Sequence, residues 1–128
     1  MLGNLKQYTI LVVDDDEDLR DSIVFDLERK GFSVASASNG REALEIVKNN
    51  KIHVVLSDVR MPGGDGVELL ENIRQIDPKV PVVILISGFA DVVREDMITR
   101  GAQQFIDKPF EPLALVGSVF AALGLPSQ

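Results

Sequence analysis

Residues Ile10–Asp18 read ILVVDDDED, an apolar run followed directly by five acidic residues. Consecutive branched apolar residues indicate a strand that is buried on both faces, as in a parallel sheet. Carboxylates clustered at the end of such a strand raise one another's pKa unless a cation neutralises them. The stretch therefore predicts a buried parallel strand with a cation site at its carboxyl end.

Short apolar runs alternate with longer amphipathic stretches along the chain. The predicted strands are Thr9–Val13, Phe32–Ala35, His53–Ser57, Val82–Ile86 and Gln104–Ile106. The predicted helices lie around residues 19–27, 43–47, 67–73 and 92–98, and from Pro112 to Leu125, because apolar residues recur there at helical spacing and proline is tolerated in a first turn. Gly31, Gly101 and Gly124 stand where helices should stop.

A strand followed by a helix thus occurs five times in succession. This alternation predicts the α/β class, as a three-layer, doubly wound (βα)5 sandwich with right-handed crossovers around a parallel five-stranded sheet. The expected strand order is 2-1-3-4-5, the flavodoxin-like arrangement, which sets the first and third strands side by side at the point where the winding reverses.

Composition narrows the classes of protein. A chain of 128 residues with 45% hydrophobic and 26% charged residues suits one globular domain. The absence of cysteine excludes disulfides, thiolate zinc sites and cysteine nucleophiles, and is compatible with a cytoplasmic location. The net charge of −7 argues against direct binding of nucleic acid, and no apolar run is long enough to cross a membrane.

Polar side chains follow the apolar runs at the positions where strands should end. Asp14 and Asp15 follow the first run, Asp58 the third, Ser87 the fourth and Lys108 the fifth. In open α/β sheets, ligands bind at the carboxyl ends of the strands, near the reversal of winding. We therefore expect the three aspartates to meet there, flanked by the serine and the lysine.

These residue types suit phosphoryl chemistry that depends on a hard divalent cation. Mg²⁺ takes one or two carboxylates together with waters and phosphate oxygens. A remaining carboxylate can attack a phosphoryl group as an aspartyl nucleophile. Lys108 supplies a further positive charge, and the hydroxyl of Ser87 can donate a hydrogen bond to a phosphoryl oxygen.

Four segments strongly resemble the receiver domain of two-component response regulators, the CheY-like family. They are ILVVDDDEDLR (10–20), VVLSDVRMPGGDGVELL (54–70), VVILISG (82–88) and GAQQFIDKPF (101–110). The segments occur in the order of the family and span nearly the whole chain. The resemblance implies a single receiver domain over residues 1–128, with its core at about 8–124.

The resemblance also implies roles for individual residues. Asp58 would accept a phosphoryl group from a sensor histidine kinase or a phosphotransfer protein in a Mg²⁺-dependent reaction. Asp14 and Asp15 would form the acidic pair that holds Mg²⁺, or alternatively Mn²⁺, with Asp15 as the direct ligand. The backbone carbonyl of Arg60 would complete the metal site. The domain would catalyse only its own phosphotransfer and slow dephosphorylation, and would otherwise not be an enzyme.

The resemblance further implies a switch. Ser87 would be the switch hydroxyl, Phe105 the switch aromatic and Lys108 the lysine that pairs with the phosphate, and the peptide bond between Lys108 and Pro109 would be cis. Phosphorylation would change the surface formed by the fourth helix, the fifth strand and the fifth helix. A homodimer partner or a neighbouring domain would bind this surface. Phe105 is equally compatible with a simple core position.

Two features depart from the commonest pattern of the family. Gly64 stands where many members have an apolar residue, so the loop after Asp58 contains two adjacent glycines and is expected to be more mobile. Arg60 and Phe89 each lie two residues beyond a functional residue, at positions that tune dephosphorylation in this family. A bulky Phe89 would obstruct the attacking water, and the hypothesis is slow intrinsic dephosphorylation.

The alternative function is that of an Mg²⁺-dependent aspartyl-phosphate phosphatase similar to the haloacid dehalogenase group. Asp14 and Asp16 match the D-x-D spacing of that group. Against it, Asp18 stands where that motif has threonine or valine, no acidic pair follows Lys108, and Asp58 would have no role. A non-phosphorylated scaffold of the same fold is a third interpretation, which the retention of every site residue disfavours.

Overall fold

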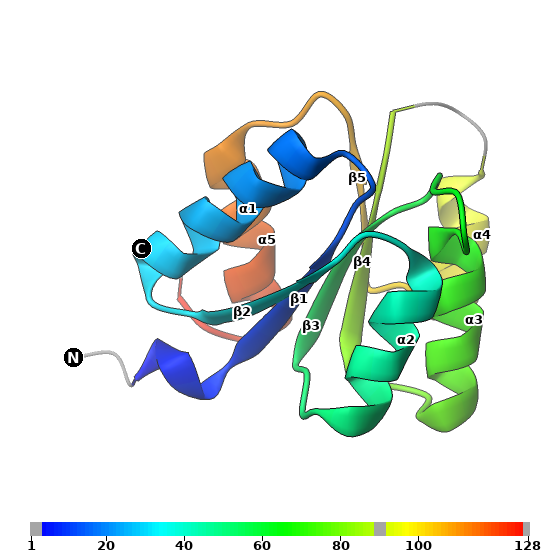
Figure 1. The fold of residues 1–128 in the computed structure, drawn as a ribbon, viewed down its shortest axis with the longest axis horizontal. Helices are drawn as coiled ribbons and strands as arrows, with labels where there is room; N and C mark the ends of the chain where they lie inside the picture. The colour runs from blue at the N-terminus through cyan, green and yellow to red at the C-terminus, as the bar shows by residue number, and fades with distance from the viewer. Residues whose placement is uncertain (1–3, 89–91, 127–128) are drawn as a thin grey trace.

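In a computed structural model, the described residues are 4–88 and 92–126, and they form a five-stranded parallel sheet between two layers of helices (Figure 1). The elements in chain order are η1 (Leu5–Gln7), β1 (Thr9–Val13), α1 (Glu17–Lys30), β2 (Ser33–Ala37), α2 (Gly40–Asn49), β3 (Val54–Asp58), α3 (Gly66–Ile76), β4 (Val82–Ser87), α4 (Arg94–Thr99), β5 (Gln104–Asp107) and α5 (Pro112–Ala122). The strand order is β2-β1-β3-β4-β5, which confirms the predicted topology. Helices α1 and α5 cover one face, and α2, α3 and α4 cover the other.

The central strands are buried on both faces, as their unbroken apolar sequences predict. On β1, Ile10 and Val12 belong to the core beneath α1 and α5, whereas Leu11 and Val13 belong to the core beneath the other three helices. Successive side chains of a strand point to opposite faces, so one apolar run contributes to both cores. This double burial fits the position of β1 in the interior of the sheet, between β2 and β3.

Four strands end later than the sequence patterns predict: β2 ends at Ala37 rather than Ala35, and three others extend to a polar residue. β3 ends at Asp58, β4 at Ser87 and β5 at Asp107, so these polar residues are the last residues of their strands rather than the first residues of the loops. The ladder explains the extension, because Asp58 is paired with Ile86 and Ser87 with Asp107. Backbone pairing thus holds two polar side chains, those of Asp58 and Ser87, at the carboxyl edge.

The second strand begins one residue later than predicted because Phe32 completes the end of α1. The N–H of Phe32 donates to the carbonyl of Leu27, and Gly31 takes the left-handed conformation (φ 111°) that favours glycine at a helix end. The Phe32 ring packs against Phe120 of α5, with the ring centroids 5.2 Å apart. This contact ties the end of α1 to α5.

The fourth helix is shorter than predicted. It begins at Arg94, and Val93 precedes it as an N-cap residue with an extended backbone and no side-chain capping bond. Val93 is 62% exposed, so its apolar side chain does not mark a buried helical face. α4 therefore has only six residues, and its attachment to the sheet depends on few side chains.

His53 has a structural role at the opposite edge of the sheet, where the strands begin. Its Nδ1 accepts a hydrogen bond from the N–H of Thr9 at 3.0 Å, and its ring contacts the ring of Tyr8 edge to face. Burial, together with the positive charge of Lys51, lowers the pKa of His53 below its usual value of 6.5. Only an unprotonated Nδ1 can accept the bond from Thr9.

We expect acid to weaken the fold through His53. Because its pKa is lower in the folded state, the unfolded state binds more protons near pH 6.5 and below, so stability is full above that pH and falls as the pH drops. His53→Asn, whose Oδ1 can accept the same bond without titrating, should lose less stability than the parent between pH 7.5 and pH 5.5. Urea unfolding at both pH values measures this; equal losses in the two proteins would contradict it.

Candidate functional site

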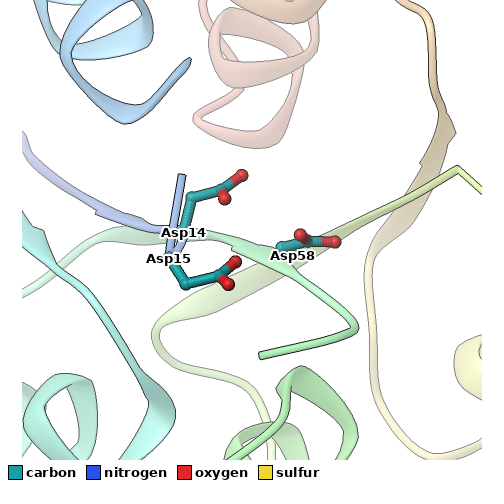
Figure 2. A group of neighbouring side chains, drawn as sticks. All are labelled: Asp14, Asp15 and Asp58. Carbon is teal, nitrogen blue, oxygen red and sulfur yellow. The ribbon is translucent and has the colours of Figure 1, made fainter. Parts of the chain in front are cut away.

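Three carboxylates converge where β1 and β3 end side by side. One carboxylate oxygen from each of Asp14, Asp15 and Asp58 can be chosen so that all three lie within 4.8 Å of one another. Asp14 is 2% exposed and Asp58 is 8% exposed, while Asp15 faces solvent. Figure 2 shows the carboxylates of Asp14 and Asp15 directed to the side on which Asp58 lies.

The sheet register accounts for this meeting. Val13 is the parallel partner of Ser57, so the residues that follow them, Asp14 and Asp58, stand at the same height on neighbouring strands. The N–H of Asp14 continues the sheet pattern by donating to the carbonyl of Ala37 at 3.2 Å. The strand order inferred from the sequence is therefore sufficient to bring the acids together.

The amino group of Lys108 is the cation beside these acids. Its Nζ lies 3.2 Å from a carboxylate oxygen of Asp58 and 3.8 Å from one of Asp14. The backbone N–H of Lys108 donates to the carbonyl of Ser87 at 2.8 Å, which ties the loop after β5 to the end of β4. The peptide bond between Lys108 and Pro109 is cis.

The charge of this cluster is unbalanced, because one ammonium group faces three carboxylates. Burial raises the pKa of Asp14, and the negative charges of Asp58 and Asp15 raise it further, while the N–H of Asp16 and the charge of Lys108 lower it. A raised pKa means that the ionised form of Asp14 is disfavoured unless more positive charge arrives. Oxygen ligands in this arrangement fit a hard divalent cation such as Mg²⁺.

Two residues that the sequence patterns did not single out hold Asp14 in place. The N–H of Asp16 donates to Oδ1 of Asp14 at 2.9 Å, and the guanidinium of Arg20 donates to the backbone carbonyl of Asp14 at 2.8 Å. Asp16 also caps α1 by accepting from the N–H of Leu19. The available signal was the position of Arg20, two residues beyond the acidic run and in the first turns of α1.

The loop after Asp58 is packed against its neighbours. A Cβ atom added at Gly66 would lie 2.3 Å from the carbonyl oxygen of Asp58, so only glycine fits at that point. The carbonyl of Gly64 accepts a hydrogen bond from the N–H of Gly40 at the start of α2. Arg60, in the same loop, is exposed. The glycines thus allow a close approach between this loop and the segment that carries Asp58.

The residues expected to form the switch lie on the next two strands of the sheet. Ser87 is 4% exposed at the end of β4, and Phe105 on β5 is 8% exposed within the core beneath α2, α3 and α4. Both residues, together with Lys108, line a cavity of about 360 Å³ beside the carboxylate cluster. Phe89, expected to tune dephosphorylation, lies outside the described residues.

Comparison with known proteins identifies the family. The model of the response regulator receiver domain matches residues 10–120. The chain is 40% identical over 111 residues to the C4-dicarboxylate transport transcriptional regulatory protein DctD of Rhizobium meliloti (strain 1021), covering 86% of this chain and 24% of DctD. It is 37% identical over 118 residues to an uncharacterised 14.6 kDa protein of Leptolyngbya boryana, covering 90% of this chain and 89% of that protein.

Solved structures give the same result. A CheY-like receiver domain protein from Methanospirillum hungatei JF-1 superposes with a TM-score of 0.85 at 30% identity, covering 91% of this chain and 94% of that one. The receiver domain of NtrX from Brucella abortus superposes with a TM-score of 0.83 at 32% identity, covering 91% and 99% of the two chains.

The chain therefore belongs to the receiver domains of two-component response regulators. Such a domain is a signalling switch rather than a conventional enzyme, and the phosphatase alternative finds no support in these relatives. This chain spans about half the length of the regulator FixJ of Rhizobium meliloti (strain 1021), and a smaller share of DctD. In the described part of the chain, no helix has the length and apolar character to span a membrane.

We predict that Asp14→Asn stabilises the metal-free protein at neutral pH. Because the pKa of Asp14 is raised in the folded state, folding binds more protons above pH 3.8, and stability falls as the pH rises through the folded pKa. Removing this charge should raise the melting temperature in EDTA by about 4 °C, the shift expected from 1 kcal/mol in a domain of this size. It should also reduce the stabilisation that Mg²⁺ provides.

The exposed neighbour Asp15 supplies the matched control. Asp15→Asn should reduce the response to Mg²⁺ with a smaller effect in EDTA, because its carboxylate is already solvated. Thermal unfolding of both variants and the parent, with EDTA and with MgCl₂, measures the two effects. A lower melting temperature for Asp14→Asn than for the parent in EDTA would contradict the electrostatic account.

Proposed function

We propose that Asp58 is the phosphoacceptor of this receiver domain, and that a histidine residue of a sensor kinase or phosphotransfer protein is the donor. The observation that carries the proposal is the setting of the Asp58 carboxylate. It lies 3.2 Å from Nζ of Lys108 and within one cluster with Asp14 and Asp15. A nucleophile that must approach an anionic phosphoryl group needs nearby positive charge, which Lys108 supplies in part and a cation held by the three acids would complete.

Asp58 is better placed for this role than the other two acids. Asp14 is more deeply buried, its Oδ1 already accepts the N–H of Asp16, and its pKa is raised by burial, so it is poorly suited to act as a free anionic nucleophile. Asp15 is exposed, away from the buried end of the sheet. Asp58 combines partial burial with the shortest distance to the lysine.

Asp14, Asp15 and Asp58 would hold Mg²⁺, or Mn²⁺ in its place, with the backbone carbonyl of Arg60 as a further ligand. When bound, the ion neutralises the excess negative charge of the cluster and screens the repulsion between carboxylate and phosphoryl group. The chain's own groups supply the rest. Lys108 pairs with phosphoryl oxygens, and the buried β3 ladder keeps Asp58 in a fixed direction.

The transfer step is a displacement at phosphorus. A carboxylate oxygen of Asp58 forms the new P–O bond, and the P–N bond to the donor imidazole breaks with its electron pair going to nitrogen. The imidazole carries a proton on its other ring nitrogen and leaves as the neutral ring. Catalysis of this transfer and slow later hydrolysis of the acyl phosphate are the only reactions proposed.

The switch follows from the new charge at Asp58. A phosphoryl group adds roughly 1.5 to 2 negative charges and three strong acceptor oxygens, which Ser87 and Lys108 are placed to contact. Both line the cavity that contains Phe105, so their movement alters the packing beneath α4. The surface of α4, β5 and α5 then changes, and a second copy of the chain or a neighbouring domain binds the changed surface.

α5 is suited to form part of such a binding surface. Its residues Pro112–Ala122 carry no charge, and Leu113 is 76% exposed. The proposed setting is the cytoplasm, without direct contact to nucleic acid or membrane through this domain. Its acidic charge of −7 is consistent with that restriction.

Substitution of single aspartates tests the assignment of the phosphoacceptor. Incubation with Mg²⁺ and a small phosphoryl donor such as acetyl phosphate should add one phosphoryl group to the parent, and none to Asp58→Asn, as measured by intact-mass spectrometry. Asp14→Asn should slow the addition about tenfold or more without abolishing it, because it weakens the metal site but leaves the nucleophile. A phosphorylated Asp58→Asn protein, together with an inert Asp14→Asn protein, would favour the phosphatase-like assignment.

A further inference from the structure

A guanidinium from α4 contacts β5 at three points beside the site. Arg94, the first residue of α4, donates from Nη1 to the carbonyl of Phe105 at 2.7 Å and from Nη2 to the carboxylate of Asp107 at 2.9 Å. Its Cζ atom also lies 5.2 Å from the centroid of the Phe105 ring. β5 is an edge strand, so these contacts engage a strand that has a sheet neighbour on one side only.

We propose that Arg94 is a positioning residue for the switch. It holds the ring of Phe105 in its buried position and holds the end of β5, next to Lys108, in the arrangement that faces Asp58. The functional part of this inference rests on the proposed roles of Asp58 and Lys108. The part that concerns Phe105 rests on the contacts of Arg94 alone.

The contacts between Arg94 and Phe105 are expected to stabilise this arrangement more than the ion pair between Arg94 and Asp107 does. The side chains of Arg94 and Asp107 are 49% and 72% exposed, and an ion pair in that setting contributes little. The bond to the Phe105 carbonyl is charge-assisted, and the guanidinium lies over the ring of Phe105, a residue that is only 8% exposed. Lysine cannot reproduce this combination, because it lacks the planar fork.

A continuous set of contacts connects Arg94 to the phosphorylation site. Arg94, Phe105, Ser87 and Lys108 line the same cavity of about 360 Å³. The N–H of Lys108 donates to the carbonyl of Ser87, and Lys108 directly follows Asp107, which Arg94 binds. A displaced Phe105 ring would therefore change the cavity wall shared by both groups that contact the phosphoryl group.

Reciprocity gives this arrangement a measurable consequence. If phosphorylation favours the buried Phe105, any contact that favours the buried Phe105 also favours phosphorylation by the same factor. Val93 offers no side-chain cap, so Arg94 is the residue of the first turn of α4 that attaches to β5 within the described residues. Loss of its side chain should release both α4 and the ring.

Fluorine NMR of protein labelled with 4-fluorophenylalanine tests the inference. The chain has six phenylalanines, and Phe105→Leu identifies the resonance of Phe105 by its disappearance. In the unphosphorylated protein, Arg94→Ala should move this resonance toward the shift of a solvent-exposed ring and increase its response to D₂O. The affinity for the phosphoryl mimic beryllofluoride in the presence of Mg²⁺ should fall about fivefold.

Arg100→Ala is the matched control. Arg100 lies at the other end of α4, and its ion pairs go to Glu71 of α3 and to Asp96 of α4 itself. The variant loses the same type of side chain and a comparable surface ion pair, so a general loosening of α4 would affect both variants. The resonance of Phe105 and the affinity for beryllofluoride should stay at parental values in Arg100→Ala.

Arg94→Lys and Asp107→Asn keep the test decisive if Arg94→Ala does not fold. Arg94→Lys should shift the Phe105 resonance in the same direction, while Asp107→Asn should leave it nearly unchanged. A Phe105 resonance in the Arg94 variants that matches Arg100→Ala would overturn the inference, and so would a shifted resonance with an unchanged affinity for beryllofluoride. If even the parent took up no phosphate, the proposed function would fail, while the resonance would still decide whether Arg94 holds Phe105.

Discussion

The properties of the site follow from the electrostatic repulsion among three carboxylates that the packing of the sheet holds close together. β1 and β3 are neighbours because both are buried on two faces, and their register places Asp14 beside Asp58. Neither strand can move away without exposing its apolar residues, so the repulsion cannot be relieved by separation. Added positive charge would relieve it, so this edge of the sheet is suited to hold a cation.

The same arrangement separates the roles of the residues around the cluster. Lys108 supplies a single positive charge close to Asp58, so the cluster keeps a net negative charge. We propose the carboxylate nearest the lysine as the nucleophile, and the buried Asp14, held by Asp16 and Arg20, as a fixed part of a cation site. At the edge strand β5, the contacts between Arg94 and Phe105 join the neighbourhood of the site to α4.

The fold and the acidic cluster could be predicted from the sequence because both follow from the order of the strands. Apolar runs identified all five strands, and the topology brought Asp14, Asp15 and Asp58 together. The bounds were less predictable, since Phe32 completes α1 and Val93 precedes α4 for reasons that lie in backbone hydrogen bonds and exposure. The contacts of Arg20 and Arg94 could not be predicted, because long flexible side chains carry no periodic signal and their partners are distant backbone carbonyls.

A titration with a paramagnetic ion tests most directly whether the three carboxylates form one cation site. Substoichiometric Mn²⁺ added to ¹⁵N-labelled protein broadens amide signals near the bound ion. The account predicts broadening centred on the amides of Asp14, Asp15 and Asp58, with protection by excess Mg²⁺ and loss in Asp15→Asn. Broadening spread over the acidic surface of this chain of net charge −7, without a centre at these residues, would contradict it.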